Sequence, residues 1–319
     1  MAQFYLRFIS YPLFQGVRND MDTADCSMLI IRGFRKLIEP YFTNDDFTNN
    51  KLASREGSEL DVTRLEKIFT NLGFKVVTKR NRSVHDMLET CKALSKLESL
   101  LSSHSAFFLT VLSHGGSNDV IYGSCGNSIA LDALIEPFRG MNCKALAGKP
   151  KIILVQACRG KLFDQGVSAR LMEEGGFDRT KCEENEEMFD ENGNELDGSL
   201  LNFSQKFQSN FRNRNNFTNI KIPHCADILI AFSCANGYYS WRNKCEGSWF
   251  IQSFCEEVEN CFSDVNGSGA DDIARILTKT VADMAFHKES SSNEECMNRT
   301  KQIPCIVSTL TKCLFLADN

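Results

Sequence analysis

The segment Lys149-Pro-Lys-Ile-Ile-Leu-Val-Gln-Ala-Cys-Arg-Gly160 carries the strongest structural and chemical signal in this chain. Its apolar run from Ile152 to Val155 predicts a buried strand. The strand leads directly into Gln156-Ala-Cys158-Arg-Gly160, so Cys158 is expected at the carboxyl end of a strand. Open α/β sheets bind their ligands at that edge. The segment therefore predicts an α/β fold with a thiol in its active site.

A second predicted strand, Phe107 to Leu112, ends in Ser113-His114-Gly115. A cysteine nucleophile needs a base that takes its proton, and histidine is the usual one. Glycine lets the backbone approach a ligand closely, so the N–H groups of Gly115 and Cys158 are expected to form an oxyanion hole. The alternative for Cys158 is a buried structural thiol, the usual role of one cysteine among fourteen. The remaining histidines are interpreted as solvated or capping residues: His85, His104, His224 and His287.

Strand and helix patterns alternate along the chain, which predicts a mostly parallel sheet covered by helices on both faces. The helix that ends at Gly73 is expected to be capped by Asp61, and a second helix to begin with a capping box at Ser83 and Asp86. Further helices are predicted for Leu131 to Phe138, Ser248 to Val258 and Asp271 to Met284. The predicted strands are Met28 to Ile31, Phe74 to Val77, Phe107 to Leu112, Lys151 to Val155, Asp227 to Phe232 and Pro304 to Leu310.

Composition limits the classes of function. The 319 residues carry a net charge of −5 without a basic block, which argues against a nucleic-acid partner. No stretch reaches the ~20 apolar residues that cross a bilayer, and the N-terminus lacks the features of a signal peptide. The fourteen cysteines do not form CxxC pairs, so neither a metal nor another cofactor is expected. We expect a cytoplasmic protein with reduced thiols; a secreted disulfide protein is the alternative.

From about Met28 to its end, the chain resembles the caspase family, and most closely the executioner caspases. The resemblance implies a three-layer sandwich with a central six-stranded, mostly parallel sheet. It also implies that Ile303 to Leu310 joins two catalytic units into one continuous sheet across a dimer. The matching motifs are Gln156-Ala-Cys-Arg-Gly160, Leu112-Ser-His-Gly115, Arg55-Glu-Gly-Ser-Glu-Leu-Asp61, Ile222-Pro-His-Cys-Ala-Asp227, Gly237-Tyr-Tyr-Ser-Trp-Arg-Asn243, Gly247-Ser-Trp-Phe-Ile-Gln-Ser253 and Lys301-Gln-Ile-Pro-Cys-Ile-Val-Ser308.

The resemblance implies a cysteine-type endopeptidase that cuts after aspartate. A carboxylate is held best by the planar forks of arginine, and Arg55, Gln156 and Arg242 match the family's slot for it. Ser240 and Arg242 would pair with the substrate backbone as an added strand. Tyr239 and Trp241 match the walls of the second subsite. Asn243 and Trp249 match residues around the fourth substrate residue.

One loop departs from the family pattern. Residues 285–300 are polar and acidic where executioner relatives carry several phenylalanines, and this loop is about three residues longer. It closes over the outer subsites in the family. An acidic rim would repel an acidic side chain at the fourth substrate residue before the cut bond. The enzyme's preference for substrate residues other than the aspartate therefore stays open.

A long acidic stretch predicts how the precursor is cut. Leu171 to Leu200 contains eleven acidic and two basic residues, a composition typical of exposed chain. The expected cleavage sites are Asp197, which precedes a glycine, and Asp190 and Asp178 as alternatives. This scheme gives a prodomain at 1–25, with Asp20, Asp22 and Asp25 as removal sites and no room for a folded adaptor. It gives a large subunit at 26–197 with the acidic linker from about 165, and a small subunit at 198–319 after a linker that ends near 221.

The leading interpretation is an executioner caspase of programmed cell death. Its expected partners are protein substrates cut after aspartate, a second copy of the chain, an upstream activating protease and inhibitor-of-apoptosis proteins. One alternative is a catalytically silent homologue that regulates a relative by dimerising with it. Another is a metacaspase-like peptidase that prefers basic residues, which the cations of Arg55 and Arg242 would repel.

Overall fold

The computed structural model describes residues 7–8, 29–30, 37–44, 52–168, 221–263 and 271–316. Its centre is a six-stranded sheet in the order β15-β11-β9-β5-β3-β4. Five strands are parallel, and β15 is antiparallel to β11. The predicted α/β class and six-stranded sheet are confirmed. The strands are β3 (Leu37–Thr43), β4 (Phe74–Arg80), β5 (Phe107–Leu112), β9 (Lys151–Gln156), β11 (Ile228–Phe232) and β15 (Cys305–Ser308).

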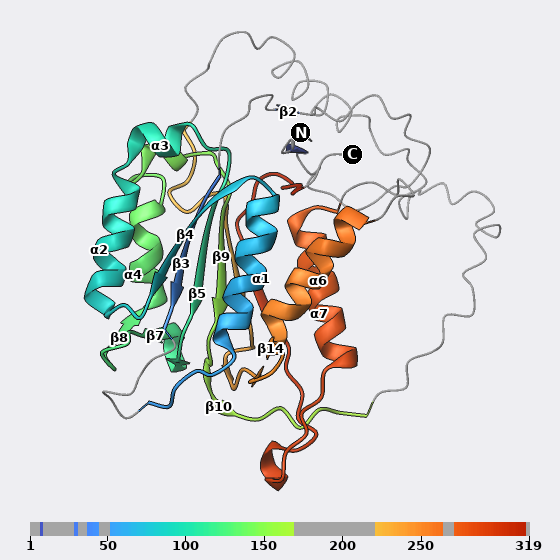
Figure 1. The fold of residues 1–319 in the computed structure, drawn as a ribbon. Helices are drawn as coiled ribbons and strands as arrows, with labels where there is room; N and C mark the ends of the chain where they lie inside the picture. The colour runs from blue at the N-terminus through green and yellow to red at the C-terminus, as the bar shows by residue number, and fades with distance from the viewer. Residues whose placement is uncertain are drawn as a thin grey trace, which may run out of the picture. The chain divides into compact units, whose positions relative to one another are not determined.

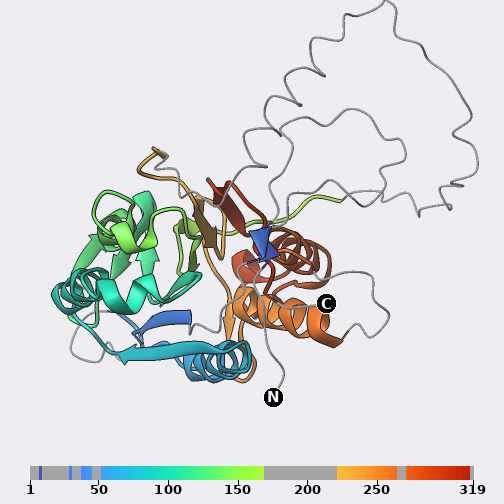
Figure 2. The ribbon, with the colours of Figure 1, turned by 90° about the horizontal axis from the view of Figure 1, so that it is seen from above.

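Helices cover both faces of this sheet (Figures 1 and 2). Along β9, Ile152 and Leu154 belong to one core cluster, while Ile153 and Val155 belong to the other. This alternation follows from the two-residue period of a strand that is buried on both sides. The first cluster includes α1 (Ser58–Asn71), α6 (Trp249–Ser263) and α7 (Ile273–His287). The second includes α2 (Val84–Ser95), α3 (Glu98–Ser102) and α4 (Leu131–Ile135).

Short elements are concentrated at the carboxyl ends of the parallel strands, where Figure 1 shows β7, β8, β10 and β14. A three-stranded sheet there contains β6 (Gly115–Gly116), β7 (Val120–Tyr122) and β8 (Ser128–Ala130). Two ladders join β10 (Gly160–Leu162) to β12 (Gly237–Tyr238) and β13 (Arg242–Asn243) to β14 (Gly247–Ser248). The 3₁₀ turns are η1 (Ser117–Asp119), η2 (Glu136–Phe138), η3 (Lys144–Leu146) and η4 (Glu295–Met297).

The predicted strand at Met28 to Ile31 overlaps β2 (Leu29–Ile30), which pairs with β1 (Arg7–Phe8) and lies outside the central sheet. One strand of the central sheet was not predicted. The sheet uses β3, which the apolar pattern hid because Glu39 and Pro40 interrupt it. The register between β3 and β5 omits these two residues, as expected where proline has no N–H to donate.

One of the two predicted helix caps was wrong. Gly57 is the N-cap of α1, with φ of 86°. Asp61 lies inside the helix and is buried, and its Oδ1 accepts hydrogen bonds of 2.8 Å from the N–H of Ser248 and from Gln252. It therefore joins α1 to the start of α6. The capping prediction for α2 is confirmed, because the Ser83 hydroxyl accepts a 3.1 Å hydrogen bond from the N–H of Asp86.

The chain divides into two compact units. One contains Met1–Gly166 and Ile222–Asn319, and the other contains Val167–Lys221. The predicted cleavage sites at Asp178, Asp190 and Asp197, and those at Asp20, Asp22 and Asp25, lie outside the described residues. Among the helices that are described, none is both long enough and apolar enough to cross a membrane.

Candidate active site

The sheet register brings the predicted histidine and cysteine to neighbouring strand ends. Strands β5 and β9 are adjacent and parallel, with Leu112 opposite Gln156. His114 and Cys158 each lie two residues beyond this pair, at the same edge of the sheet. Gly115 is so close to the other strand end that an added Cβ would overlap the carbonyl oxygen of Cys158. A glycine is therefore required between the two strand ends.

The hydrogen bond of His114 fixes which ring nitrogen can act as a base. Its Nε2 lies 2.7 Å from the carbonyl oxygen of Ala53. A carbonyl only accepts, so Nε2 carries the hydrogen and the lone pair of the neutral ring is on Nδ1. Burial lowers the pKa of His114; the Ala53 carbonyl opposes this shift, and the charges of Arg55 and Arg242 add to it. The site therefore favours a neutral imidazole, the form that can take a proton.

The thiol of Cys158 is packed against the backbone of Ser240. Its Sγ lies 3.4 Å from the Ser240 nitrogen and 3.9 Å from the Ser240 carbonyl oxygen. Burial raises the pKa of Cys158, and the Ser240 N–H and the charges of Arg55 and Arg242 oppose that rise. The cysteine is therefore a thiol in this state and needs a base before it can attack.

Next to the thiol lies a buried polar slot. Arg55 is only 2% exposed, and its Nη1 donates to the Ser58 hydroxyl at 2.8 Å and to the Asn44 carbonyl at 3.3 Å. Gln156 donates from Nε2 to the Ser240 hydroxyl at 2.9 Å. Its buried Oε1 has no hydrogen-bond partner among the residues that the structure describes. The buried guanidinium of Arg55 carries a charge that an anionic ligand would neutralise.

Arg242 is half-buried at the edge of this slot. Its Nε donates to the carbonyl oxygen of Glu56 at 2.9 Å, which connects β13 to the segment that contains Arg55. The charges of Arg55 and Arg242 both act on the pKa values of His114 and Cys158. The two strand ends therefore share a positive potential, which suits an incoming carboxylate.

Aromatic side chains continue the site beyond the slot. The rings of Tyr239 and Trp241 are edge to face at 5.7 Å, and those of Trp241 and Trp249 are stacked at 5.8 Å. Asn243 is exposed, and its Oδ1 accepts a hydrogen bond of 2.7 Å from the N–H of Cys245. The three rings form an apolar shelf next to the polar slot.

Sequence reasoning missed the residues that hold this site together. The Ser233 hydroxyl bonds the Ala157 backbone at 3.1 and 3.3 Å and accepts from the Ser240 hydroxyl at 2.9 Å. The Gln302 side chain donates to the Ser233 carbonyl and accepts from the Trp241 N–H, both at 2.6 Å. Ser233 follows a buried strand directly, so the strand-end rule could have found it. Gln302 lies in the Lys301 to Ser308 motif, but the local sequence does not indicate a role for it at the site.

Of the other histidines, His104 is buried and is a capping residue of α3, not a solvated one. It is 3% exposed, and its Nδ1 contacts the Leu100 carbonyl oxygen. It follows α3 and precedes β5, at the amino end of that strand, so it is remote from Cys158 along the sheet.

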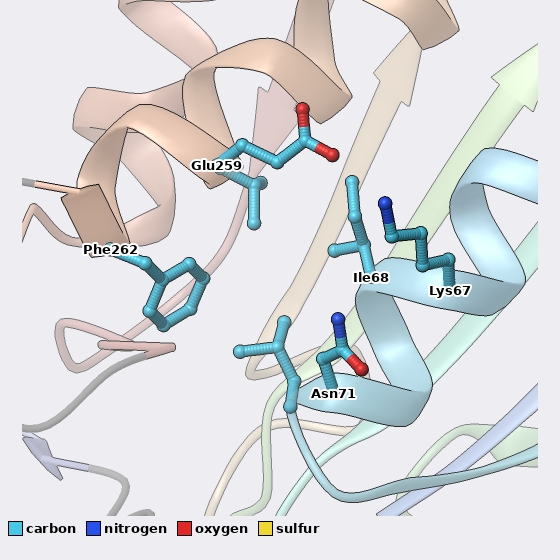
Figure 3. A pocket seen from close by; sticks show the side chains of 7 residues that line it. Lys67, Ile68, Asn71, Glu259 and Phe262 are labelled. Carbon is cyan, nitrogen blue, oxygen red and sulfur yellow. The ribbon is translucent and has the colours of Figure 1, made fainter.

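A cavity of about 520 Å³ lies between α1 and α6 (Figure 3). It lies at the opposite end of the sheet from Cys158, because Leu72 comes just before the first residue of β4. No cysteine or histidine lines it, so it is not a second catalytic centre of this kind. The lining residues are Lys67, Ile68, Asn71, Leu72, Val258, Glu259 and Phe262.

A thiol and a neutral imidazole at adjacent strand ends, beside a buried guanidinium, define a cysteine endopeptidase with an anion-binding slot. The Caspase domain family model matches residues 42–315. Caspase-7 of Gallus gallus is 36% identical over 265 residues, which is 83% of this chain and 71% of that protein. Caspase-3 of Bos taurus is 33% identical over 267 residues, 84% and 79% of the two chains.

A solved structure agrees with these sequence matches. The crystal structure of Caspase-1 from Spodoptera frugiperda superposes with a TM-score of 0.69 at 27% identity, and the match covers 90% of this chain and 94% of that one. The chain belongs to the caspase family and is a cysteine-type endopeptidase. Family membership implies protein substrates that are cut after aspartate, and a dimeric assembly.

Proposed function

We propose that the protein is an executioner-type caspase that cuts protein substrates after aspartate during programmed cell death. The observation that carries this proposal is the buried Arg55, whose charge acts on both Cys158 and His114. The similarity to Caspase-7 and Caspase-3 supports it.

In the proposed mechanism, the substrate aspartate enters the slot and accepts hydrogen bonds from Arg55, Gln156 and Arg242. If the Gln156 amide turns over, its NH₂ faces the carboxylate, and the Ser240 hydroxyl turns from Ser233 to donate to the Gln156 oxygen. Heavy-atom positions allow this, because amide orientation is assigned from hydrogen bonding. The unsatisfied Oε1 of Gln156 would then gain a partner.

The chemistry takes place between Cys158 and His114. Nδ1 of His114 takes the thiol proton, and Sγ of Cys158 forms a bond to the carbonyl carbon of the aspartate. The N–H groups of Gly115 and Cys158 stabilise the oxyanion. The imidazolium returns its proton to the leaving amine as the C–N bond breaks. Water then hydrolyses the thioester and regenerates the thiol.

The remaining parts of the proposal follow from chain organisation. The protein would be made as a precursor with a prodomain at 1–25 and cut after Asp197 by an upstream protease, with Asp178 and Asp190 as alternative sites. Subunits 26–197 and 198–319 would pair and dimerise through Ile303 to Leu310. Inhibitor-of-apoptosis proteins would be cytoplasmic regulators. Outer-subsite residues Tyr239, Trp241, Asn243 and Trp249 would line the peptide groove.

The test is cleavage of tetrapeptides that differ only in the residue before the cut: Asp, Asn or Arg. We expect processed protein to cut after Asp at least ~100-fold faster than after Asn, because a neutral amide loses the charge-assisted hydrogen bonds. Cys158→Ala is the inactive control, and Arg55→Lys should lose most of the Asp preference. Absence of cleavage would favour the silent homologue, and cleavage after Arg would favour the metacaspase-like alternative.

A second panel varies the fourth residue before the cut and addresses the polar loop at 285–300. Exposed Glu294 and Glu295 supply negative charge there. We expect an uncharged fourth residue to be cut faster than an aspartate, and the double substitution of Glu294 and Glu295 by Gln to narrow that difference.

A further inference from the structure

Phe163 contacts Tyr239 and Trp241, the two aromatic residues that match the walls of the family's second subsite. Its ring centroid lies 5.3 Å from that of Tyr239 and 5.8 Å from that of Trp241. Tyr239 and Trp241 are themselves 5.7 Å apart, so the three rings are all mutual neighbours. Phe163 is half-buried, and Tyr239 is 38% exposed. The cluster therefore keeps apolar surface open to a ligand.

The backbone on both sides of Phe163 is held in place. The carbonyl of Leu162 accepts a 2.8 Å hydrogen bond from the Tyr239 N–H, next to the ladder between β10 and β12. The carbonyl of Asp164 accepts a 2.7 Å hydrogen bond from the Lys301 N–H. Phe163 is thus fixed between two anchored neighbours, and a preorganised side chain loses little entropy when a ligand binds.

The polar loop beyond α7 offers no comparable ring, because Phe286 lies in the last turn of α7. Residues 288–300, which follow α7, contain no aromatic side chain. This loop meets the Phe163 segment through a 3.2 Å hydrogen bond from Gln165 to the Cys296 carbonyl. A third aromatic contact in this region therefore comes from Phe163 and not from the loop.

We propose that Phe163 is a specificity-determining residue that forms the third wall of the second subsite. Resting on the proposed function, this assigns the subsite an apolar side chain of medium size, such as valine, in the second residue before the cut bond. Such a side chain buries apolar area against three rings. Glycine has nothing to bury, and a charged side chain would lose hydration without a partner.

The experiment measures kcat/KM for peptides with Asp before the cut and Val, Gly or Asp in the second position. We expect the unchanged protein to prefer Val. Phe163→Ala should lower the Val-to-Gly ratio by about 5- to 10-fold, as expected for the loss of one to two buried methylene equivalents. The Val-to-Gly ratio of Phe163→Leu should lie between the ratios of the unchanged protein and of Phe163→Ala. The preference for Asp over Asn before the cut should not change.

Phe262→Ala is the matched control, because Phe262 is also partly exposed, at 40%, but lines the cavity of Figure 3. It should leave the Val-to-Gly ratio unchanged. If Phe163→Ala lowers kcat/KM equally for all three peptides, the role of Phe163 is merely structural and the proposal is overturned. A higher kcat/KM of Phe163→Ala for the Val peptide would also overturn the proposal, because Phe163 would then obstruct the subsite.

A binding measurement separates this proposal from the proposed function. The chain has two tryptophans: Trp241 belongs to the cluster and Trp249 stacks on Trp241, so fluorescence reports peptide binding there. In Cys158→Ala protein, Kd for the Val peptide should be lower than for the Gly peptide. Phe163→Ala added to this background should remove the difference. This result does not depend on turnover, whereas failure of the unchanged protein to cut after Asp would contradict the proposed function itself.

Discussion

Two adjacent glycines after His114 face different neighbours, and this gives a matched pair of substitutions. An added Cβ at Gly115 would overlap the Cys158 carbonyl oxygen and lie 2.9 Å from the Ala157 Cβ. At Gly116 the nearest atom would be a methyl carbon of Val120 at 3.3 Å, and the backbone is extended. We expect Gly115→Ala to lower kcat/KM by ~100-fold or more, the scale of a lost oxyanion donor.

Gly116→Ala should change kcat/KM by less than about threefold, because a 3.3 Å contact with one Val120 methyl group requires only a small shift. Thermal unfolding of both variants checks that they are folded. Equal decreases of kcat/KM in Gly115→Ala and Gly116→Ala would contradict the assignment of Gly115 to the oxyanion hole.

The pH profile tests the charge state of the catalytic pair. Because burial and two arginines lower the pKa of His114 from its ordinary 6.5, the imidazole stays neutral to lower pH than a free histidine. If the neutral ring is the base, activity is lost only as pH falls through this lowered pKa. We therefore expect the acid limb of kcat/KM to have its midpoint below 6.5.

Alkylation of the free enzyme gives an independent measurement. Since burial raises the pKa of Cys158 above its ordinary 9.0, its inactivation by iodoacetamide should still be accelerating at that pH. An acid midpoint above 6.5 would contradict a neutral imidazole as the base. Fast alkylation at neutral pH, together with a loss of activity at alkaline pH as the imidazolium loses its proton, would indicate a preformed thiolate–imidazolium pair instead.

At the residue scale, the sequence was informative where the chemistry follows a strand directly. Cys158 and His114 could be predicted because both follow strands that are buried on both faces. Ala53, Ser233 and Gln302 come from three other parts of the chain, and only the tertiary fold brings them to the site. Their hydrogen bonds involve backbone groups, which leave little trace in the local sequence pattern.

At the element scale, the same logic separates β9 from β3. The apolar run in β9 belongs to both core clusters, so its sequence reads as a strand without ambiguity. β3 contains Glu39 and Pro40, and local propensity therefore argued against it. Its place between β5 and β4 is a tertiary effect that no short window of sequence contains.

β15 provides a prediction for assembly. It pairs with β11 on one side, and in the described part of the chain no strand pairs with its other side. Val307 is 49% exposed on this apolar edge, which soluble proteins normally cover. If two copies pair along β15, Val307→Asp buries an unpaired charge in each copy. We expect the dimer Kd to rise by ~100-fold or more.

Val77→Asp is the matched control, because Val77 is half-buried on β4 at the other edge of the sheet. Light scattering across a concentration series measures the dimer fraction, and kcat/KM is measured in parallel. A dimer that persists in Val307→Asp and weakens in Val77→Asp would place the interface at β4.

At the scale of the whole molecule, charge is distributed unevenly. Residues 171–200 carry a net −9, while the whole chain carries −5, which leaves the remainder at +4. This acidic stretch belongs to a compact unit separate from the one that contains Cys158 and His114. The acidic composition predicts an exposed linker between a large and a small subunit, and that division stays a prediction. Composition could not indicate how the two units are arranged, because few apolar residues constrain the stretch.

The last prediction concerns processing within this acidic stretch. Full-length Cys158→Ala protein serves as the substrate, and active protein is added in trans, so that only intermolecular cutting is observed. We expect a fragment that begins at Gly198, because Asp197 combines an aspartate with a small following residue in chain that composition predicts to be exposed. Asp197→Ala in the substrate should slow the cut by ~100-fold or more.

Asp190→Ala in the same substrate is the control and should leave the Gly198 fragment unchanged, because Asp190 is followed by Glu191 and not by a small residue. Intact-mass measurement and N-terminal sequencing identify the cut. A first fragment that begins at Arg179 or Glu191 would contradict the choice of Asp197. The Cys158→Ala substrate cannot cut itself, so that result would also identify the acidic segment that the active site cuts first. It would show which sequence of the precursor's own linker fits the slot formed by Arg55, Gln156 and Arg242.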